Sequence, residues 1–592
     1  MASTHPTWRL ALISAFVLGT LPAWAHETPP PKASKPKLVQ PSPSEQSEQI
    51  AAMSAELFYD LLVGEMAASQ GDAVNAIGLL MEAARKTQSP ELYQRSAEIA
   101  LQSRSGQHAL MVANEWHRNF PESRDANRYL LQILLMLNRV SESQEPLKRE
   151  VAWTPPAAKP ATYLAIAQLY SRVSDKALAA AVVEEALQPD LRRAELAPSA
   201  WATIGHMRLA AQQKDLALQA LMHAHTLDPR SGATALLALE LMEAGVPSAE
   251  AMAQDYMRAE PAPTIQMAYV RVLRDQNRGD DAQSQLTPLL KANPDMADAW
   301  IAQASLHAQK NNWKKAQQAL QRAESLLQTI PSAAQREYAL TQAYLLGGRL
   351  SLQQKDYAQA LAWLDKIPAA NAQLNVQSLK AMALAKLGKL AQGRALIRAV
   401  PARTEAEAIQ KRQAEVALLR DNGAPQEAYL LQLTLHEQQP QDADIAYETA
   451  ILAERAGKLD AMESILRNLI AKHPTYHHAL NALGYSYADR GIRLAEAKTL
   501  IEAALQQAPN DPFITDSLAW VEFRLGNHTQ ALALLERAYA LRNDVEIATH
   551  LGEVLWTMGD KDRARSIWRQ ALQQDASNET LRTTLERLQV KP

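Results

Sequence analysis

The residues whose types and spacing best suit metal chemistry are histidines in two segments of the chain. A zinc-binding helix that begins with His-Glu needs a second histidine four residues after the first, on the same helical face. His436 makes such a start, but Pro440 stands where the second histidine is needed. His473 and His477 have the same spacing, and Pro474 between them predicts a turn whose histidines face solvent. We therefore predict no metal site.

Other catalytic arrangements are absent or weak. The phosphate-binding patterns G-x-x-x-x-G-K-[ST] and G-x-G-x-x-G do not occur. His223 and His225 are two residues apart and so point to different faces of a helix. Glu184 and Glu185 are interpreted as the solvated face of an amphipathic helix. No Ser-His-Asp set can be proposed from scattered residues without geometry. The sequence predicts a non-enzyme with no cofactor.

The elements that must position any functional surface are repeated pairs of helices. Three pivots join a leucine to a small residue: Leu483-Gly484, Leu518-Ala519 and Leu551-Gly552. A turn glycine follows each pivot, and then comes a pair of alanines seven residues apart: Ala497/Ala504, Ala531/Ala538 and Ala564/Ala571. The first alanines of these pairs are 34 and 33 residues apart. Small residues let two helix axes approach to about 8–10 Å, so the spacing predicts antiparallel helix pairs.

This order of small and large residues resembles the tetratricopeptide repeat. Ile501, Leu535 and Trp568 supply the larger apolar residue between the alanines, and Pro509 matches the proline that closes a unit. The resemblance implies an all-α fold, a right-handed α-solenoid of helix-turn-helix units. A period of roughly 34 residues, threaded through the chain, predicts about 15 units.

The array divides into three predicted segments, at residues 47–195, 196–330 and 331–592. The pattern weakens between residues 127 and 195, where Ser143 replaces a small apolar pivot. Trp153 is followed there by Pro155 and Pro156, which predict a break in the helix. Near residues 328–335 the spacing slips by about ten residues relative to the repeat period.

Composition excludes several other classes of protein. Apolar residues make up 47% of the 592-residue chain but aromatics only 5%, so the core is predicted to consist of alanine and leucine. The net charge of −3, without a basic block, favours neither nucleic acid nor an anionic membrane as a partner. The absence of cysteine excludes disulfides, thiol chemistry and an acylated lipoprotein anchor.

The start of the chain predicts export. In residues 1–25, Arg9 precedes an apolar run, and Ala23-Trp24-Ala25 forms a small-x-small cleavage site. The run at residues 10–23 is too short for a membrane span, so the mature chain is predicted to have no transmembrane segment. Residues 26–46 are rich in Pro, Ser and Lys and are interpreted as a disordered linker. These features predict a periplasmic chain free of the membrane, with secretion to the outside as the alternative.

The most promising surface lies on the last three units. In tetratricopeptide arrays the first helix of each unit lines a concave groove, which implies exposed positions beside the pivots. We call the following eight residues the groove positions: Asn481, Tyr485, Asp516, Trp520, Phe523, Arg524, Glu553 and Trp556. Asp489 and Thr549 occupy equivalent places. Four of the eight are aromatic, and aromatics beside polar groups are typical of peptide-binding hot spots. The alternative is that these aromatics pack between adjacent first helices.

A more specific resemblance suggests a function. Residues 57–121 and 480–588 resemble the tetratricopeptide-repeat adaptor of the periplasmic carboxyl-terminal processing protease. The matching motifs are Asn-Ala-Leu-Gly-Tyr at 481–485, Asp-Ser-Leu-Ala-Trp at 516–520 and His-Leu-Gly-Glu-Val-Leu-Trp at 550–556. Members of that family are typically outer-membrane lipoproteins that bind the protease and present cell-wall hydrolases to it. The resemblance implies a non-catalytic adaptor that binds proteins or peptides. A structural scaffold in envelope assembly or polysaccharide export is the alternative.

Overall fold

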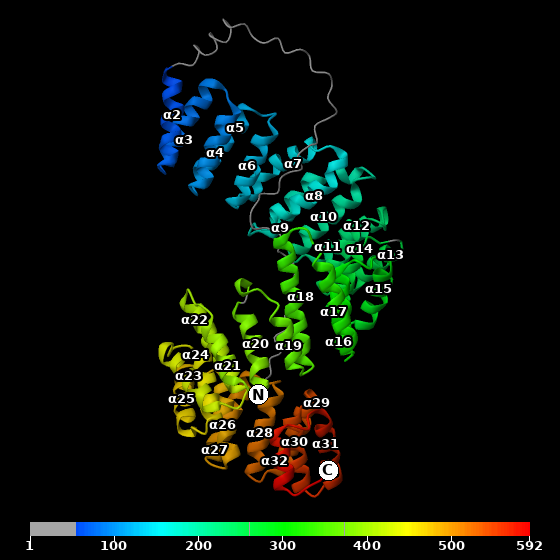
Figure 1. Ribbon diagram of the computed structural model, residues 1–592, viewed down its shortest axis with the longest axis vertical. Helices are drawn as coiled ribbons and strands as arrows, with labels where there is room; N and C mark the ends of the chain where they lie inside the picture. The colour runs from blue at the N-terminus through cyan, green and yellow to red at the C-terminus, as the bar shows by residue number, and fades with distance from the viewer. Residues whose placement is uncertain (1–54, 260, 372, 592) are drawn as a thin grey trace. The chain divides into compact units, whose positions relative to one another are not determined.

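The computed structural model describes residues 55–259, 261–371 and 373–591. The predicted signal peptide at residues 1–25 and the predicted linker at 26–46 lie outside this part of the chain. The described residues form 31 α-helices and five short 3-10 helices, with no β-strand among them. They divide into two compact units, residues 55–329 and 330–591 (Figure 1).

The unit of residues 55–329 consists of eight successive helix pairs. The helices are α2 (Ala55–Ser69), α3 (Ala73–Thr87), α4 (Pro90–Gln102), α5 (Gly106–Asn119), α6 (Arg124–Met136), α7 (Gln144–Trp153), α8 (Lys159–Tyr170), α9 (Lys176–Leu187), α10 (Ala197–Ala210), α11 (Lys214–Leu227), α12 (Gly232–Glu243), α13 (Glu250–Met257), α14 (Pro263–Asp275), α15 (Gly279–Ala292), α16 (Ala297–Gln309) and α17 (Trp313–Leu327). Four 3-10 helices interrupt them: η1 (Val140–Ser143), η2 (Pro156–Ala158), η3 (Asp190–Arg192) and η4 (Pro247–Ala249).

The unit of residues 330–591 continues with seven pairs and a final single helix. Its helices are α18 (Ala333–Gln353), α19 (Tyr357–Leu364), α20 (Leu374–Lys386), α21 (Leu390–Ala399), α22 (Glu405–Arg420), α23 (Pro425–Gln438), α24 (Ala443–Arg455), α25 (Leu459–Lys472), α26 (His477–Arg490), α27 (Leu494–Gln507), α28 (Pro512–Arg524), α29 (His528–Leu541), α30 (Val545–Thr557), α31 (Lys561–Gln574) and α32 (Glu579–Arg587), with the 3-10 helix η5 (Ala369–Asn371). The fifteen pairs in the described residues agree with the predicted count, and the all-α repeat fold is confirmed.

Small residues lie where the two helices of a pair cross, as the spacing predicts. A Cβ atom added to Gly484 in α26 would come within 2.6 Å of Ile501 Cγ1 in α27. One added to Gly552 in α30 would come within 2.3 Å of Trp568 Nε1 in α31. Such distances are shorter than any van der Waals contact, so these pairs can close only around glycine. The alanines of the second helices, Ala497, Ala531 and Ala564, are fully buried.

Turn residues end the helices where the sequence places them. Gly526 and Gly559 have φ values of +88° and +95°, a left-handed conformation that glycine adopts without a steric penalty. Asp511 precedes α28 and accepts backbone hydrogen bonds from Phe513 and Ile514, which satisfies free N–H groups of the first turn. The residues at which each helix begins and ends fix its length. They therefore determine which side chains face the neighbouring helices.

The two irregular places in the repeat pattern have different structural causes. The helix break after Trp153 is real, because α7 ends there and η2 follows. Near residues 328–335, the extra residues mostly extend a helix: α18 begins at Ala333 and has 21 residues, against 13 for α16. Ser332 caps α18 by accepting a hydrogen bond from the backbone N–H of Gln335.

Candidate functional site

The first helices α26, α28 and α30 carry the groove positions, and they pack side by side. All eight positions were predicted to be exposed, and for three of them this prediction is wrong. Asp516, Trp520 and Glu553 are only 5–6% exposed, because side chains of the adjacent first helices and of α32 cover them. For Trp520 the alternative of packing between adjacent helices describes what the structure shows.

A buried histidine explains why Asp516 and Trp520 are covered. His550 of α30 is 4% exposed, and its ring stacks on Trp520 of α28 with centroids 4.3 Å apart. Its Nδ1 atom lies 2.9 Å from Asp516 Oδ2, and its Nε2 atom lies 3.5 Å from the Tyr485 hydroxyl of α26. His550 therefore joins three successive first helices through one side chain. In the sequence, His550 is distinguished only as the first residue of the motif at residues 550–556.

The charges around His550 favour its protonated form. Burial lowers the pKa of His550, but the carboxylate of Asp516, its hydrogen bond and the nearby Glu553 and Glu546 outweigh burial, so the pKa is raised above its ordinary value. Burial and the same acidic surroundings raise the pKa of Tyr485 well above its ordinary range, which keeps that hydroxyl neutral. The result is a buried Asp516–His550 pair beside the rings of Trp520 and Tyr485, in which the acidic neighbours favour a protonated histidine.

Glu553 has a structural partner, and single polar atoms of Asn481 and Trp520 are covered. Glu553 Oε2 accepts a hydrogen bond of 2.6 Å from Arg587 of α32, the last described helix. Asn481 Oδ1 and Trp520 Nε1 have no hydrogen-bond partner in the described residues, and both atoms are covered by neighbouring side chains. These two atoms are therefore not contact points for a partner in this arrangement.

Five groove positions keep a surface that a partner can reach. Asn481, Tyr485, Phe523 and Trp556 are half-buried, and Arg524 is exposed. Trp556 packs against Trp568 with ring centroids 5.8 Å apart and lies beneath the cations of Lys561 and Arg565.

The reachable positions are also held in place. Arg524 donates a 2.6 Å hydrogen bond to the carbonyl of Asp489, which ties α28 to the end of α26. Phe523 packs on Trp520 with ring centroids 5.3 Å apart. Together these contacts form a rigid aromatic surface with a cation at its edge.

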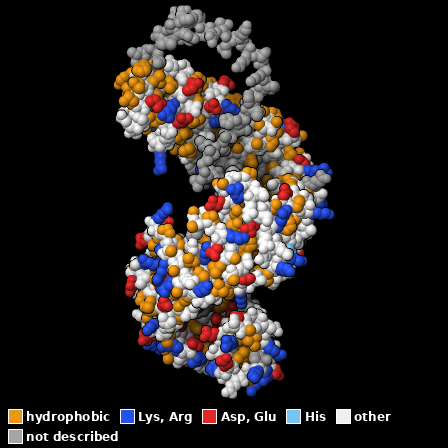
Figure 2. Space-filling model, viewed as in Figure 1, with side chains coloured by type: hydrophobic (Ala, Val, Ile, Leu, Met, Phe, Trp, Pro, Cys, Tyr) orange, Lys and Arg blue, Asp and Glu red, His pale blue; other side chains and the backbone are white. Residues whose placement is uncertain are grey.

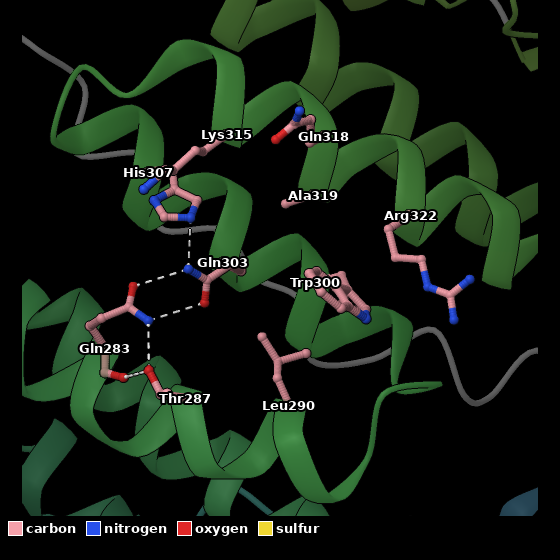
Figure 3. A pocket seen from close by; sticks show the side chains of 10 residues that line it. All are labelled: Gln283, Thr287, Leu290, Trp300, Gln303, His307, Lys315, Gln318, Ala319 and Arg322. Atoms are coloured by element: carbon pink, nitrogen blue, oxygen red, sulfur yellow. Dashed lines mark hydrogen bonds between the residues drawn. The ribbon is translucent and has the colours of Figure 1, made fainter.

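A separate cavity of about 550 Å³ lies on α15, α16 and α17, within the unit of residues 55–329 (Figure 3). Its polar wall is a hydrogen-bonded chain in which the amides of Gln283 and Gln303 pair reciprocally at 3.1 and 3.2 Å. Gln303 also bonds the ring of His307, and Gln283 bonds Thr287. The sequence does not indicate this site, because single lysines, arginines and glutamines on amphipathic helices give no distinguishing pattern.

Groups considered for catalysis or metal binding are scattered. His473 follows the last residue of α25, and His477 is the first residue of α26, so a turn separates them. In the part of the chain that the structure describes, no three His, Cys, Asp or Glu side chains are grouped so as to hold a metal ion. None of the described helices has both the length and the apolarity needed to cross a bilayer. On the face seen in Figure 2, basic and acidic side chains are mixed.

Comparison with known proteins agrees with the helix-pair geometry. The family model described as tetratricopeptide repeat matches residues 268–334, 447–512 and 517–579. The chain carries tetratricopeptide repeats. A curated relative, TPR repeat-containing protein PA4667 of Pseudomonas aeruginosa, is 37% identical over 208 residues, which cover 35% of this chain and 35% of the relative. The match thus spans about a third of the length of that relative. The resemblance to a protease adaptor stays a prediction.

Solved structures that match this chain superpose on it with low TM-scores. The thermophilic TPR protein TTC0263 of Thermus thermophilus is 23% identical, covers 31% of this chain and 99% of its own, and gives a TM-score of 0.28. The Cut9-Hcn1 hetero-tetramer of APC/C is 15% identical and covers 92% of this chain and 99% of its own, with a TM-score of 0.31. MamA of Desulfovibrio magneticus is 15% identical and covers 30% of this chain and 99% of its own, with a TM-score of 0.25.

Proposed function

We propose that this tetratricopeptide-repeat protein is a non-catalytic adaptor of the bacterial periplasm. Its specific task, in this proposal, is to bind a carboxyl-terminal processing protease and to present cell-wall hydrolases to it. The observation that carries the proposal is the row of half-buried aromatics on adjacent first helices: Tyr485, Phe523 and Trp556. Aromatic anchors that are already packed lose little conformational freedom on binding, which favours affinity.

The export signal and the lack of cysteine support the proposed compartment. Residues 1–25 have the charge, apolar run and cleavage site of a secretory signal, and the chain has no cysteine for a lipid anchor. The proposal predicts a periplasmic form whose N-terminal residue is His26. N-terminal sequencing of the protein from a periplasmic extract tests this directly. A chain that keeps Met1 and fractionates with the cytoplasm would reject it.

A pull-down from periplasmic extract tests the binding surface. The chain is immobilised as wild type, as Phe523→Ala and as Trp556→Ala, with circular dichroism to confirm that each variant is folded. Tyr338→Ala is the matched control, because Tyr338 is an aromatic residue 47% exposed on α18, outside the groove positions. We expect a protease and a cell-wall hydrolase with the wild type and the control, and less of both with the two groove variants.

The possible outcomes distinguish the binding surface, the adaptor role and the alternative scaffold function. Equal recovery with all four proteins would reject this surface as the binding site. Recovery of neither a protease nor a hydrolase by the wild type would reject the adaptor role. Recovery of a membrane assembly complex in their place would favour the scaffold function in envelope assembly.

A further inference from the structure

The cavity on α15–α17 differs from the groove positions in both place and chemistry. Two of its three helices, α15 and α17, are second helices of their pairs, whereas the groove positions lie on first helices. Its two formal charges, Lys315 and Arg322, are both positive, and no Asp or Glu lines it. Neither cation has a carboxylate partner among the residues that the structure describes. The cavity therefore offers two free positive charges.

The spacing of the two cations suits an extended chain. Lys315 and Arg322 are seven residues apart on α17, which places them on one face and about 10 Å apart along the axis. Successive residues of an extended peptide advance by about 3.3 Å, so carboxylates two to four residues apart span a comparable distance. Both cations are exposed and carry long side chains that can adjust to the ligand.

The wall between the cations is largely apolar. Trp300 is half-buried, and its indole N–H is fixed by a 2.9 Å hydrogen bond to the carbonyl of Pro294. Leu290 and Ala319 lie beside it, so an apolar side chain entering the cavity meets a preformed surface (Figure 3). The exposed amide of Gln318 is available for a peptide backbone. Burial lowers the pKa of His307, and the charges of Lys315 and Lys310 lower it further, so this ring is neutral at pH 7.

We infer that this cavity binds an acidic segment of a partner protein, in which an apolar side chain is flanked by Asp or Glu. The apolar side chain packs on Trp300 and Leu290, and the carboxylates pair with Lys315 and Arg322. A nucleic acid is a poorer fit, because two cations neutralise few phosphates and the wall between them is apolar. The inference extends the proposed protein-binding function to a second surface, and it holds whichever partner occupies the first.

Fluorescence anisotropy with a defined peptide tests the inference on the purified full-length chain. The probe is a fluorescein-labelled peptide amide, Glu-Glu-Leu-Glu-Glu, whose amidation removes the terminal carboxylate. We expect saturable binding that weakens as ionic strength rises, because exposed ion pairs are screened. The matched Gln-Gln-Leu-Gln-Gln peptide is expected not to bind, and Glu-Glu-Ala-Glu-Glu to bind more weakly.

Single substitutions identify the site. Lys315→Gln and Arg322→Gln are each expected to weaken binding about threefold, the usual size of an exposed ion pair. The double variant is expected to lose about tenfold. Lys314→Gln is the matched control, since Lys314 is an exposed cation on the same helix that does not line the cavity. Trp300→Ala is expected to abolish the preference for leucine over alanine.

Four results would overturn the inference. Three of them are the absence of binding, equal binding of the glutamine peptide, and binding that the double variant leaves unchanged. Displacement of the probe by inorganic phosphate at equal concentration would also overturn it, because the cavity would then be a simple anion site. Failure of the peptide to bind, together with a positive pull-down, would leave the adaptor proposal intact. Binding of the peptide together with a negative pull-down would support the inference for this cavity and reject the adaptor proposal.

Discussion

His550 forms a buried electrostatic contact between the first helices of the C-terminal repeats. Its pKa is higher in the folded chain than in the unfolded chain because Asp516 lies 2.9 Å away. Its contribution to the free energy of unfolding is therefore fully present below the unfolded pKa of about 6.5, and is lost as pH rises through the raised folded pKa. We predict that His550→Gln lowers stability by about 1–3 kcal/mol at acidic pH and by less above neutrality.

Urea unfolding followed by circular dichroism, at several pH values from acidic to mildly alkaline, measures this dependence. His473→Gln is the control, because His473 is an exposed histidine of the same unit. The loss caused by His550→Gln should shrink with rising pH, whereas the control should track the wild type. A His550→Gln loss that is the same at every pH would show that the ring acts by packing alone.

A second buried ion pair stabilises the irregular region near η2 and η3. Lys159 Nζ lies 2.6 Å from Asp190 Oδ2, with both side chains at most 5% exposed, and Tyr163 donates a 2.8 Å hydrogen bond to the same oxygen. Asp190→Asn leaves a buried lysine charge, and we predict a loss of about 3–5 kcal/mol in unfolding free energy. The double variant Lys159→Met/Asp190→Leu removes both charges and should recover most of that loss. A double variant as unstable as the single one would contradict this account.

At single positions the sequence identified the faces of the helices but not what covers them. Distance from a pivot tells on which face Trp520 lies, because that depends only on helical periodicity. The burial of Trp520 depends on His550, which lies 30 residues further along the chain. The His550 ring reaches Trp520 only after two helix pairs have packed. Lys315 and Arg322 were missed for the same reason, since their shared cavity involves three helices.

At the scale of helix pairs the prediction from sequence was accurate, because the requirement for small residues is local. Gly552 meets the indole of Trp568, which is held by a 3.2 Å hydrogen bond to the Thr549 carbonyl and cannot easily move away. We predict that Gly552→Ala lowers the free energy of unfolding by about 1–3 kcal/mol through overpacking. Whether the extra residues near 328–335 form a loop or lengthen a helix could not be decided from sequence, because this stretch contains no pivot.

Gly78 is the control for Gly552, since a Cβ atom added there meets nothing within 4 Å although it also lies inside a helix. Gly78→Ala should raise stability by about 0.5–1 kcal/mol, because alanine restricts the unfolded chain. Urea midpoints of the two variants against the wild type provide the measurement. If the urea midpoints of both variants shift in the same direction, helix propensity determines both effects, and the close approach of the two helices at Gly552 does not.

For the whole molecule, a repeat array predicts that damage stays local. Each helix pair contacts mainly its neighbours, so stability is a sum of unit and interface contributions. We predict that Gly552→Ala raises amide hydrogen exchange in α28–α32, whose side chains share one buried cluster, and leaves α3–α12 at wild-type rates. Hydrogen–deuterium exchange with mass spectrometry on the full-length chain resolves this by peptide. A uniform rise along the chain would show that the repeats unfold as one cooperative body, and surface substitutions could then weaken distant binding sites through stability alone.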